Sequence, residues 1–195
     1  DELLQHMEAE AAAEQEQMNK LVQEAMEQGA MGVSTSLIYA PADFASTEEI
    51  ISLASEAARY KGMYITHMRS ESDNILKALN ETFRVAREAN IRAEIYHLKI
   101  NHDRNWNKIE QVLEKIDSAQ KAGLKITANM YPYAASNTAL TARLPNWVQE
   151  GGAGEMRKRL KNPATRKKVL EEMRLGIPTK NSDPKSVVIL GFRLD

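Results

Sequence analysis

Residues 63–98 read MYITHMRSESDNILKALNETFRVAREANIRAEIYHL, and this stretch decides the fold of the chain. It begins with a short β-type run, Met63–His67, and ends with a second one, Ala93–Leu98. Between the two runs, apolar residues such as Ile75 and Leu79 recur at helical spacing. A strand, a helix and a second strand over about 30 residues form one βα repeat.

The same repeat continues on both sides of this stretch. Further β-type runs lie at Gly32–Leu37 and Leu124–Met130, and a helical stretch separates each run from the next. The steps from Met63 to Ala93 and from Ala93 to Leu124 are 30 and 31 residues. Such alternation predicts an α/β fold with a parallel sheet covered by helices, and the near-constant step favours a barrel over an open sheet. We therefore expect a partial (β/α)8 barrel of the TIM type.

The period breaks after Tyr133. Residues 145–184 contain helical stretches, and we expect them to form a helical insertion or lid at the barrel mouth. The run Ser186–Leu190 resembles another strand. The expected organisation is a partial barrel in 1–144, the insertion in 145–184 and a return to a barrel strand in 185–195. At most five strands are visible, about half of a barrel that needs about 250 residues.

The composition limits the possible partners and location. The chain is 43% hydrophobic and 27% charged, has a net charge of −1 and contains no cysteine, which excludes disulfides and thiolate ligands. The balanced charge favours neither nucleic acid nor a membrane surface. The basic run Arg157–Lys168 lacks aromatic residues, so a solvated helix face is expected there. No run of about 18 apolar residues, which a transmembrane helix would need, is present. The segment Asp1–Glu14 is acidic and alanine-rich, the opposite of a signal peptide, which begins with positive charges. We expect a cytoplasmic protein.

Two histidines mark a candidate metal site. His67 ends one predicted strand, and His97 lies near the end of the next, 30 residues later. Parallel strands of a barrel end at one edge, and neighbouring strands lie about 4.8 Å apart, so both imidazoles can reach one divalent ion. The alternative is two strand-end histidines that bind loop backbone.

Residues near the histidines could hold a substrate. Arg69 and Lys99 each lie two positions after a histidine and could bind a carboxylate. Tyr131, Tyr133 and Ser136 follow the next strand and could donate hydrogen bonds to a carboxylate or an oxyanion. The alternatives are surface salt bridges for the two cations, with Glu71 as a partner, and rim packing for one of the tyrosines.

Four ordered segments carry a family resemblance. They are GAMGVSTSLIYAP from Gly29, YITHMRSESD from Tyr64, IYHLKI from Ile95 and ITANMYPYAASNTAL from Ile126. In their order and separation they resemble the N-acyl-D-amino-acid deacylases, or D-aminoacylases, of the amidohydrolase superfamily. The likeness covers the central part of that family's catalytic barrel, about strands four to eight.

The resemblance implies an activity and roles for particular residues. A metal-activated water would attack the amide of a small-molecule substrate, an N-acyl-D-amino acid, and release a carboxylate and a D-amino acid. The metal would be zinc, with His67 and His97 as the ligands on strands five and six. Lys99 and Tyr131 or Tyr133 would contact the substrate carboxylate, and Arg69 and Ser136 are further candidates.

Much of the family's active site has no counterpart in this sequence. The paired histidines of the first strand, a bridging cysteine and a catalytic aspartate are missing, so no catalytic residue is assigned. We expect an enzyme in which this chain is one part, inactive alone and self-associating through open barrel edges. The alternatives are a related cyclic-amide hydrolase and a non-catalytic half-barrel that acts as a binding or assembly module.

Overall fold

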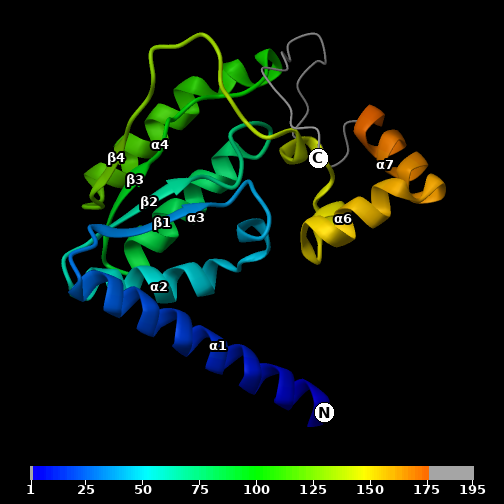
Figure 1. Ribbon diagram of the computed structural model, residues 1–195. Helices are drawn as coiled ribbons and strands as arrows, with labels where there is room; N and C mark the ends of the chain where they lie inside the picture. Colours follow the sequence, from blue (N-terminus) through cyan, green and yellow to red (C-terminus); the bar gives the residue numbers. More distant parts are fainter. Residues whose placement is uncertain (1, 176–195) are drawn as a thin grey trace.

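The structure is a computed structural model, and it describes residues 2–175. The strand predicted in 185–195, with Ser186–Leu190 at its centre, lies outside the described residues. Strands and helices alternate along the first part of the chain (Figure 1). Their bounds are α1 Glu2–Glu27, β1 Gly32–Ser36, α2 Thr47–Arg59, β2 Met63–His67, α3 Ile75–Glu88, β3 Arg92–Ile95, α4 Ile109–Lys121 and β4 Ile126–Ala128. Short 3-10 helices span Ala42–Phe44, Asp103–Lys108 and Leu140–Arg143.

The four strands form one parallel sheet in the order β1-β2-β3-β4. This confirms the partial parallel barrel that the βα period predicted. The prediction for β2 is correct to the residue, but β3 ends at Ile95 and not at Leu98, and β4 is only three residues long. The reason at β3 is that His97 has a φ of 40°, which no strand residue adopts.

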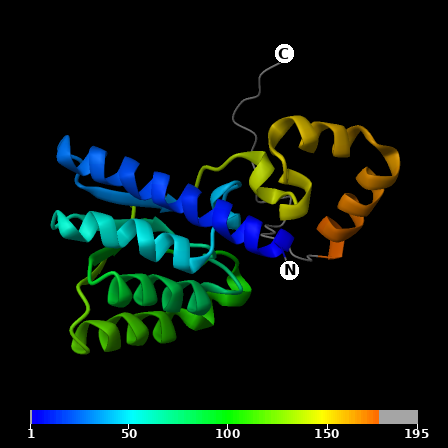
Figure 2. The ribbon, with the colours of Figure 1, turned by 90° about the horizontal axis from the view of Figure 1, so that it is seen from below.

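The helices cover one face of this sheet. Figure 2 shows α1, α2, α3 and α4 side by side in one row, in the order of the sequence. The start of α2 has a local cause: the Ser46 side chain accepts from the backbone N–H of Glu49, whose carboxylate accepts from the Ser46 N–H in return.

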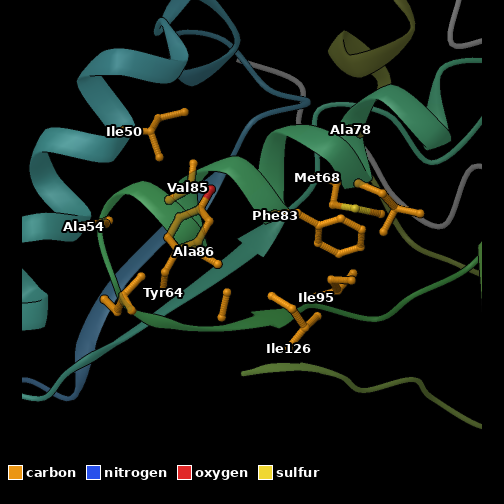
Figure 3. Packing of buried hydrophobic residues seen from close by; sticks show 14 of the residues in the cluster. Ile50, Ala54, Tyr64, Met68, Ala78, Phe83, Val85, Ala86, Ile95 and Ile126 are labelled. Atoms are coloured by element: carbon orange, nitrogen blue, oxygen red, sulfur yellow. The ribbon is translucent and has the colours of Figure 1, made fainter. Parts of the chain in front are cut away.

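Alternate side chains of the strands point into the layer between sheet and helices. Tyr64 is 1% exposed there, and Ile95 and Val85 are fully buried (Figure 3). On the other face, Ser34 and Thr127 are exposed. The sheet is thus largely apolar toward its helices, where the buried Thr66 accepts a hydrogen bond from Thr35, and largely polar toward what would be the interior of a barrel. This alternation fixes which residues of each strand can face an active site.

The three helices after the sheet segment are α5 Asn146–Gln149, α6 Gly152–Lys161 and α7 Pro163–Leu175. They lie apart from the sheet in both ribbon views (Figures 1 and 2). Trp147 donates to the Glu172 carboxylate at 2.8 Å, and Val148 and Val169 are buried. Helices therefore occur where the sequence predicted an insertion in 145–184, and its role as an insertion or lid stays a prediction. No helix in the described part of the chain combines the length and apolar character that a membrane span requires.

Candidate metal and substrate site

His67 is held at the end of β2 by the sheet itself. Its backbone pairs with Ser36 of β1, and its carbonyl accepts from the Leu37 N–H at 2.9 Å. The imidazole is 14% exposed, and the ring of Tyr39 lies edge-on to it, with the centroids 5.4 Å apart. Strand register therefore fixes this side chain on the polar face of the sheet, at its C-terminal edge.

His97 lies two residues beyond β3, in a left-handed turn. Its N–H donates to the Asn129 side-chain oxygen at 2.7 Å, and the next N–H, that of Leu98, donates to the Asn129 carbonyl at 2.8 Å. The turn brings the His97 ring to a centroid distance of 4.4 Å from the His67 ring, at an interplanar angle of 81°. The two histidines thus meet at one edge of the sheet, as their 30-residue spacing predicted.

A carboxylate joins the two histidines. Glu71 is 3% exposed, and its Oε1 lies 2.9 Å from His97 Nδ1, 3.7 Å from His67 Nε2 and 2.6 Å from Lys99 Nζ. Sequence reasoning considered Glu71 only as a salt-bridge partner and missed it as a member of the site. The sequence feature that could have indicated it is its position four residues after His67. Only the fold of the loop, however, shows that this position brings the carboxylate to the two histidines. The Glu71 carbonyl, which accepts from the Asn101 N–H at 2.7 Å, anchors that loop.

The donor set fits a divalent ion such as zinc. One ligand atom each from His67, Glu71 and His97 lies within 4.8 Å of the others. Imidazole nitrogens and carboxylate oxygens are both zinc ligands, and two ligand atoms on one ion lie about 3.3 to 4 Å apart. Displacements of these ligand atoms by about 1 Å would therefore be enough to bring them to the spacing of ligands on one ion. His97 Nδ1 lies 2.9 Å from both Glu71 Oε1 and Lys99 Nζ. In the tautomer whose Nδ1–H donates to Glu71, the lone pair of Nε2 is left for the ion, whereas a Nδ1 that accepts from Lys99 would leave the proton on Nε2.

The predicted substrate-binding residues Lys99, Tyr131 and Ser136 line the same pocket as the histidines. Lys99 Nζ lies 5.6 Å from the centroid of the Tyr131 ring, so a cation and a hydroxyl share one wall. Burial raises the pKa of Tyr131, a hydrogen bond with Ser136 opposes this shift, and the charge of Glu71 adds to it. The phenol therefore remains a hydrogen-bond donor at neutral pH.

Arg69 also lines the pocket, but its donors bind protein groups. Its Nε donates to both oxygens of Glu81, at 3.0 and 3.2 Å. Its terminal nitrogens donate to the carbonyls of Asp43 at 2.7 Å and Ala45 at 2.9 Å. The hydrogen bond with Glu81 raises the pKa of Arg69. This geometry favours a structural role for Arg69, tying β2 to α3 and to the start of α2.

Tyr133 lies outside this pocket. It is 75% exposed and stacks on Tyr131, with the ring centroids 6.2 Å apart. The far wall includes residues that sequence reasoning did not single out. Tyr39 and Thr138 are joined by a hydroxyl hydrogen bond of 2.8 Å, and burial lowers the pKa of the neighbouring Arg143. No spacing in the sequence pointed to them, because they are 99 residues apart and meet only through the loop after β4.

A parallel βα sheet with two histidines and a carboxylate at its C-terminal edge has the architecture of a metal-dependent hydrolase barrel. No family model matches the chain. The chain is 40% identical over 123 residues to a D-aminoacylase of Alcaligenes xylosoxydans xylosoxydans. These residues are 63% of this chain and 25% of that protein, so the chain spans about a quarter of the curated relative's length.

Solved structures give the same result. A crystal structure of D-aminoacylase, described as defining a subset of amidohydrolases, matches with a TM-score of 0.62 at 38% identity, over 64% of this chain and 26% of that one. An N-acyl-D-glutamate deacylase from Bordetella bronchiseptica, complexed with zinc and a phosphonate inhibitor, matches with a TM-score of 0.61 at 34% identity, over 63% of this chain and 26% of that one. These matches confirm the resemblance to the N-acyl-D-amino-acid deacylases of the amidohydrolase superfamily over the matched residues.

Proposed function

We propose that this chain carries part of the active site of a zinc-dependent hydrolase that cleaves N-acyl-D-amino acids to a carboxylate and a D-amino acid. The observation that carries the proposal is the cluster of His67, Glu71 and His97, in a chain homologous to D-aminoacylase. The neighbouring Lys99 supplies the positive charge that a substrate carboxylate requires.

In this proposal His67 and His97 hold the zinc ion, and Glu71 lies beside them. The chemistry that zinc supplies when bound is a lowered pKa of water and polarisation of the amide carbonyl. Glu71 Oε1 lies within hydrogen-bond distance of both His97 Nδ1 and Lys99 Nζ, so it can orient one ligand and one substrate-binding group at the same time.

The substrate carboxylate binds at the wall formed by Lys99, Tyr131 and Ser136. Lys99 contributes an ammonium group, and Tyr131 contributes a phenol whose raised pKa keeps it protonated. We include Tyr133 only as a residue that packs on Tyr131, and we include Arg69 as a support for the strand end rather than as a substrate contact.

The general acid/base and the remaining metal ligands of such an enzyme come from outside this chain in our proposal. The chain alone would then bind zinc without catalysing turnover, and the open edges at β1 and β4 would favour self-association. A cytoplasmic location is part of the same proposal. We also propose a partial barrel in 1–144 and an insertion in 145–184, and the returning strand in 185–195 stays a prediction.

A zinc titration by calorimetry tests the metal site. The full chain should bind about one zinc ion, and His67→Ala and His97→Ala should each weaken binding by at least about 100-fold, beyond what loss of a supporting residue causes. His6→Ala is the matched control, because His6 is 70% exposed on α1. Equal affinities in all four proteins would refute the metal site.

Hydrolysis assays test the substrate class. A protein that contains this chain and the remaining parts of the site should release D-amino acids from N-acyl-D-amino acids, and its His97→Ala variant should not. Preferential opening of cyclic ureides would favour the cyclic-amide alternative. Zinc binding without turnover of either substrate by that protein would favour the binding module.

A further inference from the structure

The backbone at His97 has an unusual conformation. Its φ of 40° lies in the left-handed region, which residues other than glycine seldom adopt. Such a conformation persists only where surrounding contacts hold it, and it often marks a functional site. His97 is also the candidate ligand that lies outside the strand ladder, so sheet register does not place it.

Asn129 supplies the contacts that hold this turn. Its N–H donates to the Ile95 carbonyl at 3.1 Å, and its carbonyl accepts from the Leu98 N–H at 2.8 Å. Between these two, its side-chain oxygen accepts from the His97 N–H at 2.7 Å. Asn129 thus bonds to the chain before, at and after the turn.

The sheet explains why Asn129 can do this. Ala128 of β4 pairs with Ile95, the last residue of β3, so Asn129 comes next to the point where β3 leaves the sheet. The backbone contacts of Asn129 follow from this register and are open to any residue. The contact with the His97 N–H needs a side-chain acceptor of this length.

Glu94 orients the Asn129 side chain. The Asn129 amide nitrogen donates to one oxygen of the Glu94 carboxylate, and the Thr127 hydroxyl donates to the other at 3.1 Å. A carboxylate can only accept, so it forces the amide nitrogen toward Glu94 and the amide oxygen toward His97. Asn129 is exposed and lies outside the set of residues that line the pocket, which separates it from the substrate contacts.

We propose that Asn129, oriented by Glu94, is the positioning residue that holds the left-handed turn at His97 and so places the His97 ring beside His67 and Glu71. The proposal rests on the metal-binding role of His97 proposed above. In this proposal, polar residues on the inner face of β3 and β4 hold His97 in place, whereas strand register holds His67.

The first test uses Asn129→Ala in the full chain. Without metal, the His97 amide proton should exchange with solvent at least about tenfold faster, because its acceptor is gone. In zinc titrations the variant should bind about 10- to 100-fold more weakly, the usual effect of removing a group that orients a ligand. Asn107→Ala is the matched control, an exposed asparagine in the 3-10 helix Asp103–Lys108, and it should leave the exchange of the His97 amide unchanged.

The second test exchanges the two polar partners. Asn129→Asp places a carboxylate against Glu94 and should weaken zinc binding. Adding Glu94→Gln to it should restore affinity to within about threefold of the parent chain, because Gln at 94 can donate to Asp at 129, whose other oxygen still accepts from His97. A residue that only stabilises the fold would show no such rescue.

The outcomes separate this inference from the proposed function. If the parent chain binds zinc and Asn129→Ala binds it equally well, the positioning role is overturned and the metal site stands. If the parent chain binds no zinc, the metal site fails, and the amide-exchange experiment still decides whether Asn129 holds the turn. Unchanged exchange at His97 overturns the inference in either case.

Discussion

The two candidate metal ligands are held in different ways. His67 belongs to β2 and has a paired residue on the neighbouring strand, so the hydrogen-bond ladder places it. His97 has left β3, and hydrogen bonds from the loop after β4 place it. One strand end of this site is therefore part of a rigid sheet, whereas the other depends on a few side chains.

The sequence spacing found both residues although they are held by different means. A βα repeat of constant length brings successive strand ends to one edge, whatever the local conformation. The exact position of each imidazole ring is determined by the local contacts of that residue. Substitutions in the sheet should therefore act on the whole fold, and substitutions in the loops should act on the site.

The largest effect is expected from Gly32→Ala in β1. A Cβ at this position would lie 1.9 Å from the Met63 carbonyl oxygen, so the β1–β2 pairing that places His67 could not form. We expect a loss of more than about 3 kcal/mol in the free energy of unfolding, measured by denaturant titration. Gly154→Ala in α6 is the control, because no atom lies within 4 Å of its added Cβ. Equal stability of the two variants would show that β1 does not pair as described.

The second effect concerns the residue that both ligands share. Glu71→Gln keeps the shape of the side chain but removes the charge that faces Lys99 and both histidines. We expect zinc affinity to fall about 10- to 100-fold and the free energy of unfolding to fall by about 2 to 3 kcal/mol, because Lys99 loses its charged acceptor. Calorimetry and urea unfolding measure the two quantities. Glu88→Gln, at an exposed position of α3, is the control, and a change no larger than the control's would contradict the shared role.

A smaller effect separates support of a strand end from binding at the site. Arg69→Met removes the hydrogen bonds to Glu81 and to two backbone carbonyls. We expect the free energy of unfolding to fall by about 1 to 2 kcal/mol, with zinc affinity unchanged within about twofold. Should stability remain while substrate binding by an active protein is lost, Arg69 would be a substrate contact, as the sequence first suggested.

The sequence predicted the repeat, the parallel sheet and the meeting of His67 with His97, because these depend on period and strand direction. The Ser46–Glu49 capping box depends only on residues close in the sequence, so a local pattern of this kind can also be read from the sequence. The sequence did not predict that β3 would end before His97, since the contacts that hold that turn come from Asn129, 32 residues later. The place of Glu71 was missed for the same reason. Contacts between loops depend on how each loop closes, and residue spacing alone does not encode this.

The smallest effect tests a link between the two loops that follow the ligands. Arg104, in the loop after β3, donates to both oxygens of Asp73, in the loop after β2, at 3.0 and 2.8 Å. The hydrogen bond with Arg104 lowers the pKa of Asp73 from 3.8 to about 2. A carboxylate whose pKa is lower in the folded state stabilises the protein above its unfolded pKa, and this contribution is lost as the pH falls from about 4 to about 2.

Both side chains are about half exposed, at 52% for Arg104 and 50% for Asp73, so solvent screens the pair. Asp73→Asn should therefore cost less than about 1 kcal/mol near neutral pH. Urea unfolding of the variant and the parent chain should show this difference shrinking as the pH is lowered through the range below about 4, with Glu110→Gln in α4 as the charge-matched control. Combining Asp73→Asn with Arg104→Gln should add little to either single change if the pair acts as one unit. Additive losses, or a difference that persists at low pH, would mean that Asp73 and Arg104 do not act as a pair. The loops after β2 and β3 would then be joined through Glu71, whose side chain faces Lys99 and whose carbonyl accepts from the Asn101 N–H.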